Sequence, residues 1–195
     1  MATTLFLARH GETDWNAGRR WQGHADPPLN DRGREQAAAL ARLLAPEPLD
    51  AVYASDLRRA YETARVVADG RGLEVTTIPE LREVDVGSWS GMTREEIRHR
   101  FPEGFRRWAA QEGHGWEDGE SYEEMAERVV AALLRVATHH RDGSVLVVTH
   151  GGPVRAALGH ASGLSALDAR RELRVVENCD VARLAVEDGT FRALD

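Results

Sequence analysis

Short apolar runs and stretches of helical periodicity alternate along this chain. The runs at residues 5–8, 51–54 and 145–148 have the length of buried strands. Residues 73–78 alternate in polarity and are rich in β-branched side chains, which is typical of a further strand. The pattern therefore predicts at least four short strands distributed over the chain.

The segments between these runs predict amphipathic helices. Over residues 31–44 apolar side chains recur at i, i+3, i+4 and i+7, and two prolines follow. A second helix is expected at about residues 56–69, with Ser55 placed to cap its start. Ser121 and Glu124 have the S/T-x-x-E spacing of a capping box, which opens the most strongly patterned helix of the chain.

This alternation predicts an α/β fold, a three-layer αβα sandwich with a mostly parallel central sheet covered by helices on both faces. Residues 181–186 and 190–194 flank an Asp-Gly pair, which predicts a closing hairpin. The chain fits a single domain, residues 1–195, with a cap or insertion segment at about 88–120. Within that segment, residues 111–120 are the best loop candidate and could lie over a site.

Composition and charge limit the partners of this domain. With 42% hydrophobic and 29% charged residues, and no long apolar segment, we expect a soluble protein without a membrane partner. The absence of a secretory signal pattern and the single Cys179 favour the cytoplasm. A net charge of −7 argues against nucleic acid, yet local arginine clusters allow a small anion to bind.

Two of the predicted strands end in histidine followed by glycine, in LFLARHG and VLVVTHGG. In open α/β sheets ligands bind beyond the carboxyl ends of strands, so His10 and His150 are candidates for one site. Metal ligation is a rival interpretation. However, a zinc site needs three or four ligands, and the chain has one cysteine and no H-x-x-x-H spacing. Arg9 would repel a dication, so the local charge favours an anion and we expect no metal.

If that anion is a phosphoryl group, these residue types have defined roles. A neutral imidazole nitrogen can attack phosphorus while a hydrogen bond to the other nitrogen fixes the tautomer. The planar guanidinium of arginine matches two phosphate oxygens. A carboxylic acid can protonate the leaving oxygen. Such a reaction requires neither a metal nor another cofactor.

Five blocks of the sequence resemble, in order, the signature blocks of the histidine phosphatase superfamily, in its phosphoglycerate mutase-like branch. The resemblance extends from residue 5 to about residue 157 and implies a phosphoglycerate mutase-like fold. The blocks are RHGETDWN, RWQGHADPPLNDRG, SDLRRAYETA, LREVDVGSW and VTHGG.

The resemblance implies a role for the residues of the first and third blocks. His10 would be the nucleophile that becomes phosphohistidine, and Arg9 beside it would bind phosphoryl oxygens. The family pattern places a phosphate ligand immediately before the alanine of SDLRRAYETA, which selects Arg59 over Arg58. Adjacent residues point about 100° apart on a helix, so only one of the two can dominate.

The later blocks imply the rest of the catalytic set. His150 would stabilise charge in the transition state, and Glu83 occupies the general-acid position with Asp85 as the fallback. The residues that match positions lining the phosphate or its approach are Asn16, Gln22, Gly23 and Gly151.

The superfamily contains mutases, phosphatases and members without catalysis, so the fold alone does not decide the function. The stretch between Glu83 and His150 is shorter than that of the cofactor-dependent mutases it resembles, whose insertion helps to exclude water. The resemblance therefore implies a metal-independent phosphomonoesterase of a small phosphorylated metabolite. A phosphoglycerate mutase and a non-catalytic phosphate-ligand binder are the alternatives. The natural substrate and the oligomeric state, a homodimer included, stay open.

Overall fold

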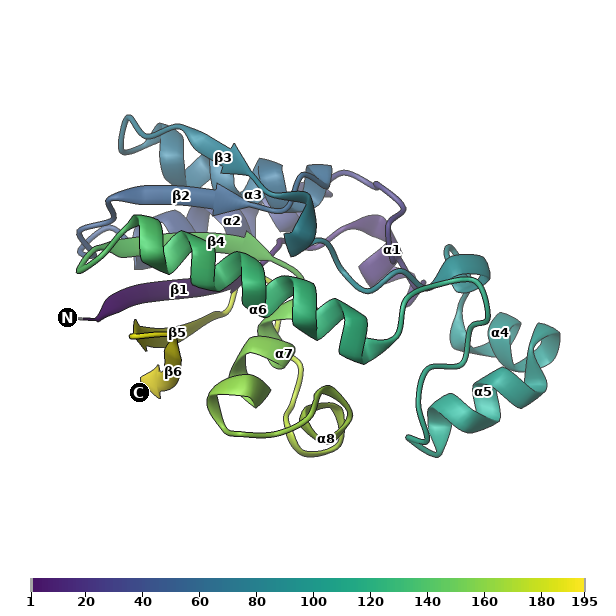
Figure 1. The fold of residues 1–195 in the computed structure, drawn as a ribbon. Helices are drawn as coiled ribbons and strands as arrows, with labels where there is room; N and C mark the ends of the chain where they lie inside the picture. The colour runs from purple at the N-terminus through teal and green to yellow at the C-terminus, as the bar shows by residue number, and fades with distance from the viewer. Residues whose placement is uncertain (1, 195) are drawn as a thin grey trace.

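The computed structural model describes residues 2–194 and is built on a six-stranded sheet in the order β3-β2-β4-β1-β5-β6 (Figure 1). Strands β3, β2, β4 and β1 are parallel to one another, whereas β5 is antiparallel to β1 and pairs with β6 as a hairpin. The strands are β1 (Thr3–Arg9), β2 (Ala51–Ala54), β3 (Val75–Thr77), β4 (Ser144–Thr149), β5 (Val181–Glu187) and β6 (Thr190–Leu194). The predicted mostly parallel sheet and its closing hairpin are confirmed.

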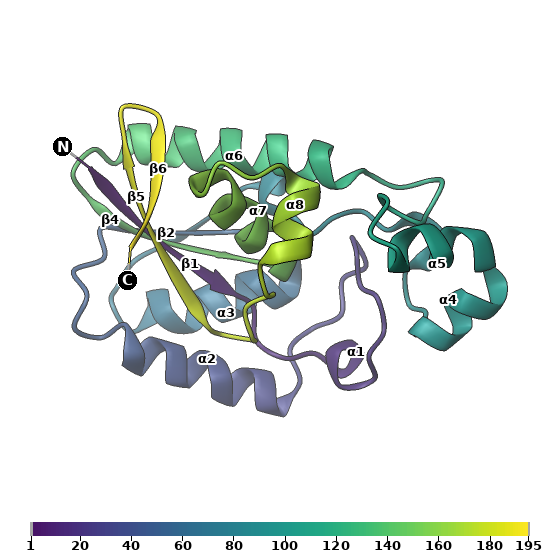
Figure 2. The same cartoon turned by 90° about the horizontal axis from the view of Figure 1, so that it is seen from below.

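Helices cover both faces of this sheet, as Figure 2 shows, so the predicted three-layer αβα arrangement is confirmed as well. Helices α2 and α3 lie on one face, and α6 and α7 lie on the other. None of the helices within residues 2–194 combines the length and apolar character needed to cross a bilayer. The helices are α1 (Asp14–Ala17), α2 (Asp31–Leu43), α3 (Arg58–Asp69), α4 (Arg94–Arg100), α5 (Pro102–Ala109), α6 (Tyr122–His139), α7 (Gly151–Ala161) and α8 (Ala166–Glu172), with short 3₁₀ turns at Pro79–Leu81 and Gly87–Trp89.

Strand β1 explains why the first apolar run lacks polar alternation. Its side chains alternate between two buried clusters, because Leu5 and Leu7 pack on the side of α6 and α7 while Phe6 and Ala8 pack on the side of α2 and α3. All four side chains are at most 2% exposed. A strand with helices on both faces must be apolar throughout, as observed.

Helix α6 follows the predicted pattern closely. Ser121 caps it, its side chain accepts the backbone N–H of Glu124, and the Glu124 carboxylate accepts the Ser121 N–H in return. The apolar face predicted from the sequence is buried against the sheet. Thr93 and Glu96 have the same S/T-x-x-E spacing and cap α4 in the same way.

One local prediction after β2 is wrong, and the strand predicted at β3 is confirmed but shorter than expected. Helix α3 begins at Arg58 with Leu57 as its N-cap, and Ser55 does not cap it. The carboxylate of Asp26, from a distant segment, accepts the Arg58 N–H at 2.6 Å and takes over the capping role. The strand expected over residues 73–78 is reduced to β3, Val75–Thr77. The short helices α1, α5 and α8 were not predicted.

The segment that carries α4 and α5 lies beyond the carboxyl ends of β1, β2 and β4, away from the sheet (Figure 1). Residues 111–120 contain no helix or strand, as predicted. The aromatic side chains of this segment form a cluster of edge-to-face contacts, in which Trp89 and Trp116 have their ring centroids 5.4 Å apart. This cluster gives the segment a packed interior of its own.

The loop that follows β1 is held against the start of α2 by close backbone contact. Glu12 accepts the Asn30 N–H at 3.0 Å and its own N–H is accepted by Gln36 at 2.8 Å. Gly33 lies so near that a Cβ atom there would be 2.1 Å from the Glu12 carbonyl oxygen. Because the obstacle is backbone, this position accepts no side chain without moving the loop.

We therefore expect Gly33→Ala to lower the free energy of unfolding by about 1–3 kcal/mol, the usual range for an overpacked site. Gly70→Ala is the matched control, because a Cβ at Gly70 would meet only the Val67 carbonyl oxygen at 3.9 Å. That control should change stability by no more than about 0.5 kcal/mol. Urea unfolding of the three proteins measures both values. Equal stability of the two variants would show that the contact is not tight.

Candidate active site

The pairing of β1 with β4 brings the two strand-end histidines together. The last residues of the two strands, Arg9 and Thr149, are partners in the parallel ladder, and His10 donates its N–H to the Thr149 carbonyl at 2.9 Å. The residues that follow the two strands, His10 and His150, are therefore neighbours. Their ring centroids are 5.1 Å apart.

The tautomer of His10 is determined by its own loop. Its Nδ1 lies 2.7 Å from the carbonyl oxygen of Gly11, and a carbonyl can only accept, so Nδ1 carries the proton. The other nitrogen, Nε2, consequently has a free lone pair when the ring is neutral. Burial, followed by the charges of Arg59 and Arg9, lowers the pKa of His10 well below its ordinary value. The ring is therefore uncharged near pH 7 and keeps a lone pair on Nε2.

His150 is fully buried, and neither of its ring nitrogens has a hydrogen-bond partner within residues 2–194. Burial is the main reason that its pKa is lowered well below the ordinary value, with Arg59 and His10 adding to the effect. His150 is not among the residues that line the cavity described below, but its ring contacts that of His10, which does line it. A buried imidazole without a partner is costly and is typical of a functional group awaiting a ligand.

Arg59 lies on the first turn of α3 and is completely buried. Its Nη1 and Nη2 donate to the carbonyls of Ala25 and Gly23, at 2.6 and 2.9 Å, while Nε has no partner in the protein. Burial lowers the pKa of Arg59 to about 10, so the guanidinium remains charged at neutral pH. The Thr63 hydroxyl ties this turn to the histidine loop, because it donates to the Arg59 carbonyl and accepts the Gly11 N–H.

Arg9 provides a second cation on the other side of His10. Its Nη1 donates to the Val176 carbonyl at 2.9 Å, its Nε is buried without a partner, and burial lowers its pKa. Two buried guanidinium groups with free N–H donors beside a neutral imidazole form a site for a tetrahedral oxyanion.

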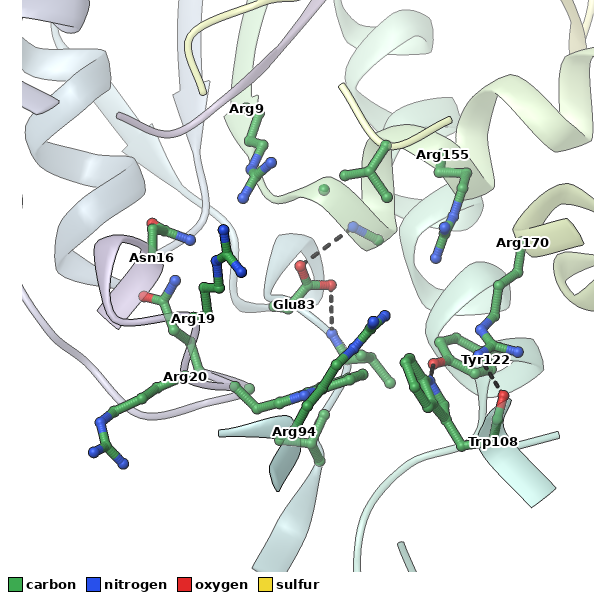
Figure 3. A pocket seen from close by; sticks show the side chains of 18 of the residues that line it. Arg9, Asn16, Arg19, Arg20, Glu83, Arg94, Trp108, Tyr122, Arg155 and Arg170 are labelled. Atoms are coloured by element: carbon green, nitrogen blue, oxygen red, sulfur yellow. Dashed lines mark hydrogen bonds between the residues drawn. The ribbon is translucent and has the colours of Figure 1, made fainter. Parts of the chain in front are cut away.

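Glu83 supplies the carboxylate of the site. Its two oxygens accept the N–H groups of Val84, at 3.0 Å, and of Gly152 on α7, at 3.2 Å (Figure 3). The loop that carries it is held by Arg128, whose guanidinium donates to the Glu83 carbonyl at 2.9 Å. Asp85, the fallback candidate, does not line the cavity.

A cavity of about 620 Å³ opens at this edge of the sheet and is lined by most of the predicted site residues. The predicted residues on its wall are Arg9, His10, Asn16, Gln22, Gly23, Arg59, Glu83 and Gly151. The remaining wall comes from α4, α5, α6, α7 and α8 and from the loop positions 19–21, 84, 86, 111 and 175. Its residues that the sequence reasoning missed include Arg94, Trp108, Tyr122, Arg155 and Arg170.

One signal in the sequence could have identified Arg155. It follows Gly151 by four residues on α7, and residues at i and i+4 lie on the same helix face. The other missed residues carry no such local signal. Within residues 2–194, no group of three or more His, Cys, Asp or Glu side chains is arranged to hold a metal ion.

The fold and this histidine and arginine site define an α/β protein with a cavity suited to a small oxyanion at the carboxyl end of its parallel strands. The model of the histidine phosphatase superfamily (branch 1) matches residues 5–195, and the chain belongs to this superfamily.

Known relatives agree with this membership. The chain is 43% identical over 154 residues to phosphoserine phosphatase 1 of Hydrogenobacter thermophilus, covering 78% of this chain and 72% of that protein. It is 37% identical over 167 residues to the glucosyl-3-phosphoglycerate phosphatase of Mycolicibacterium vanbaalenii, covering 82% and 74%. The solved structure of Bacillus stearothermophilus YhfR superposes with a TM-score of 0.92 at 35% identity, covering 98% of this chain and 95% of that one. Proteins named as phosphoglycerate mutase-like match as well.

The buried neutral histidines lead to a prediction for stability against pH. In the unfolded chain a histidine takes up a proton below its ordinary pKa of 6.5, whereas folded His150 does not. The unfolded state then binds more protons, so stability falls as the pH falls below 6.5. We expect His150→Gln to remove about 1 kcal/mol of the stability loss between pH 6.5 and 5.5.

Urea unfolding at the two pH values, on the wild type and the variant, measures this difference. His99→Gln, at an exposed position on α4, is the matched control and should keep the wild-type pH dependence. An identical pH dependence in wild type and His150→Gln would mean that His150 is protonated in the folded protein.

Proposed function

We propose that the protein is a metal-independent phosphomonoesterase that hydrolyses a small phosphorylated metabolite through a phosphohistidine on His10. The observation that carries this proposal is the His10 ring, whose Nδ1 is committed to the Gly11 carbonyl at 2.7 Å. Nε2 is thereby left as an uncharged nucleophile between two arginines. Relatives named as phosphoserine and glucosyl-3-phosphoglycerate phosphatases support the hydrolytic outcome. The free Cys179 fits a cytoplasmic enzyme.

In the first half-reaction the Nε2 lone pair of His10 attacks phosphorus, and the bond from phosphorus to the leaving oxygen breaks. The Glu83 carboxyl group donates its proton to that oxygen, which leaves as an alcohol. Arg9, Arg59 and the single ring N–H of neutral His150 donate to the three peripheral oxygens as the transition state forms. These groups are in place before the substrate binds, so they need no reorganisation.

In the second half-reaction a water molecule attacks the phosphorus of the phosphohistidine. The Glu83 carboxylate takes the proton of that water, the phosphorus–nitrogen bond breaks, and the electron pair returns to Nε2 of His10. Inorganic phosphate leaves and the starting state is restored. Each proton that Glu83 gives in the first step is thus recovered in the second.

We further propose that residues 88–120 act as a cap over this site. Phe105, Trp108 and Ala109 of α5 form part of the cavity wall, which supports the assignment. A cap that carries apolar side chains would limit water around the leaving group while leaving room for the attacking water.

His10→Ala is expected to lower kcat/KM for p-nitrophenyl phosphate by more than roughly 10³-fold, because it removes the nucleophile. The wild type, quenched during turnover, should carry acid-labile phosphate on His10, and the variant should carry none. Treatment with EDTA should leave the activity unchanged. A variant that keeps substantial activity, or activity that EDTA abolishes and zinc restores, would contradict the mechanism.

The fate of the phosphoryl group separates the phosphatase from the mutase. We expect the wild type, incubated with 3-phosphoglycerate, to release inorganic phosphate faster than it forms 2-phosphoglycerate. Both products can be followed in one reaction by phosphorus NMR. Predominant interconversion of the two phosphoglycerates would make the protein a mutase instead.

Glu83→Gln should lower kcat/KM by about 10²–10⁴-fold for an alkyl phosphate and far less for p-nitrophenyl phosphate. The nitrophenolate leaves without a proton, whereas an alkoxide needs one. The ratio kcat/KM is chosen because it reports the first half-reaction and not the later hydrolysis. Asp85→Asn is the matched control and should affect both substrates little. Equal losses on the two substrates in Glu83→Gln would argue against a general acid.

A further inference from the structure

The cavity extends well beyond the space that a phosphoryl group needs. Arg9 and Asn16 lie on one side of Glu83, whereas Arg155, Arg170, Tyr122 and Trp108 lie on the other (Figure 3). The proposed mechanism uses the first side and leaves the second without a role.

Arg155 of α7 points into this second side of the cavity (Figure 3). It is half-buried, and burial lowers its pKa. Within residues 2–194 it makes no hydrogen bond and no ion pair. Tyr122 and Glu83 act against the effect of burial on its pKa, and the smaller effect of Arg170 adds to that of burial. A guanidinium that is partly removed from water and makes no ion pair is unfavourable unless a ligand supplies a counter-charge in direct contact.

Arg170 of α8 lies next to it and is also short of partners. Its Nη2 donates to the Trp108 carbonyl at 2.7 Å, and its guanidinium stacks 5.0 Å from the Trp108 ring and 5.1 Å from the Tyr122 ring. Its Nη1 is buried without a hydrogen-bond partner in the protein. Arg94, exposed on α4, packs its guanidinium 4.8 Å from the same Trp108 ring. The two aromatic rings thus hold arginines in position and leave N–H donors free.

Arg128 shows how this protein treats a purely structural arginine. Its guanidinium donates to the carbonyls of Glu80, Arg82 and Glu83 and makes two bonds of 2.6 Å to the Glu120 carboxylate. Arg155 has none of these contacts, although both side chains are partly removed from solvent. The comparison argues that Arg155 is kept for binding and not for holding the fold.

The charge of the wall is strongly one-sided. Seven arginines line the cavity among the described residues, and the only carboxylate there is Glu83. Both oxygens of Glu83 already accept backbone N–H groups. A monoester phosphate on Arg9 and Arg59 would leave the charge of Arg155 and Arg170 unbalanced.

We propose that the substrate carries a second anionic group, a carboxylate or a second phosphate, and that Arg155 and Arg170 bind it with Arg94 at the rim. This inference rests on the proposed function, since it takes the phosphoryl group to lie at His10. It assigns the substrate class as phosphate monoesters whose alcohol part carries a carboxylate or a second phosphate, rather than monoesters of an alcohol without an anionic group.

The test compares the binding of matched compounds that differ only in the second anion. The compounds are 3-phosphoglycerate against glycerol 3-phosphate, O-phosphoserine against O-phosphoethanolamine, and glucose 1,6-bisphosphate against glucose 6-phosphate. Dissociation constants are measured by calorimetry on His10→Ala, which prevents turnover. They are measured again after adding Arg155→Gln, Arg155→Lys, Arg170→Gln or the matched charge control Arg192→Gln, at an exposed position on β6.

In at least one pair, we expect the compound with the second anionic group to bind roughly 10- to 100-fold more tightly than its partner. This is the value of a charge-assisted contact. Arg155→Gln should remove most of that preference, Arg155→Lys should restore part of it, and Arg192→Gln should leave it unchanged. A preference within the two acid pairs identifies a carboxylate as the second anion. A preference within the bisphosphate pair alone identifies a second phosphate. As a folding control, Arg155→Gln should unfold in urea in one cooperative transition like the wild type. Arg192→Gln should keep kcat/KM for p-nitrophenyl phosphate within about twofold.

The inference is overturned if no pair shows a preference, or if the preference survives both Arg155→Gln and Arg170→Gln. It is also overturned if both members of each pair lose affinity equally. The proposed function fails separately, if the wild type does not hydrolyse p-nitrophenyl phosphate through His10. Because binding is measured without turnover, the two failures are distinguishable.

Discussion

The register of β1 against β4 is the constraint on which the site depends. Arg9 and Thr149 close the parallel ladder opposite one another, and this pairing alone decides that His10 and His150 become neighbours. A shift of one residue would also turn the buried side chains of β1 towards the wrong layer. Leu5 and Phe6, which belong to different cores, therefore help to specify the position of His10, five and four residues further on. Packing of the two hydrophobic layers and placement of the histidines are one and the same requirement.

The site concentrates groups that a stable interior would avoid. Within residues 2–194, six buried side-chain nitrogens lack a hydrogen-bond partner in the protein, and five of them belong to Arg9, Arg59, His150 and Arg170. Such groups lower stability, because each has given up water without a replacement. Most of these nitrogens donate N–H hydrogen bonds or carry positive charge, so one type of ligand, an oxyanion, would satisfy most of them together. The cost in stability and the affinity for an anion therefore have the same origin.

The sequence predicted those parts of the molecule that depend on neighbouring residues. The strands, the amphipathic helices and the strand-end histidines all follow from patterns within about ten residues. The failures occurred where a distant segment intervenes. Ser55 has the residue type of a cap, but Asp26 caps α3 from another part of the chain. Helix α1 has only four residues, too few for periodicity to detect. The far wall of the cavity is built by α4, α5, α6, α7 and α8, whose mutual packing no local pattern contains.

The start of α7 shows how closely the two sides of the cavity are connected. A Cβ on Gly152 would lie 2.2 Å from a carboxylate oxygen of Glu83, so a side chain there would displace the carboxylate from its present contact with the Gly152 N–H. The same helix begins directly after His150 and carries Arg155 one turn later. One helix terminus thus positions the second histidine, the carboxylate and the arginine of the outer wall. His150 and Arg155 are joined by one rigid element, and Glu83 is hydrogen-bonded to its start. If the proposed phosphoryl site at His10 and second-anion site at Arg155 are both correct, the fold sets the distance between them, and that distance limits the length of the substrates the cavity can hold.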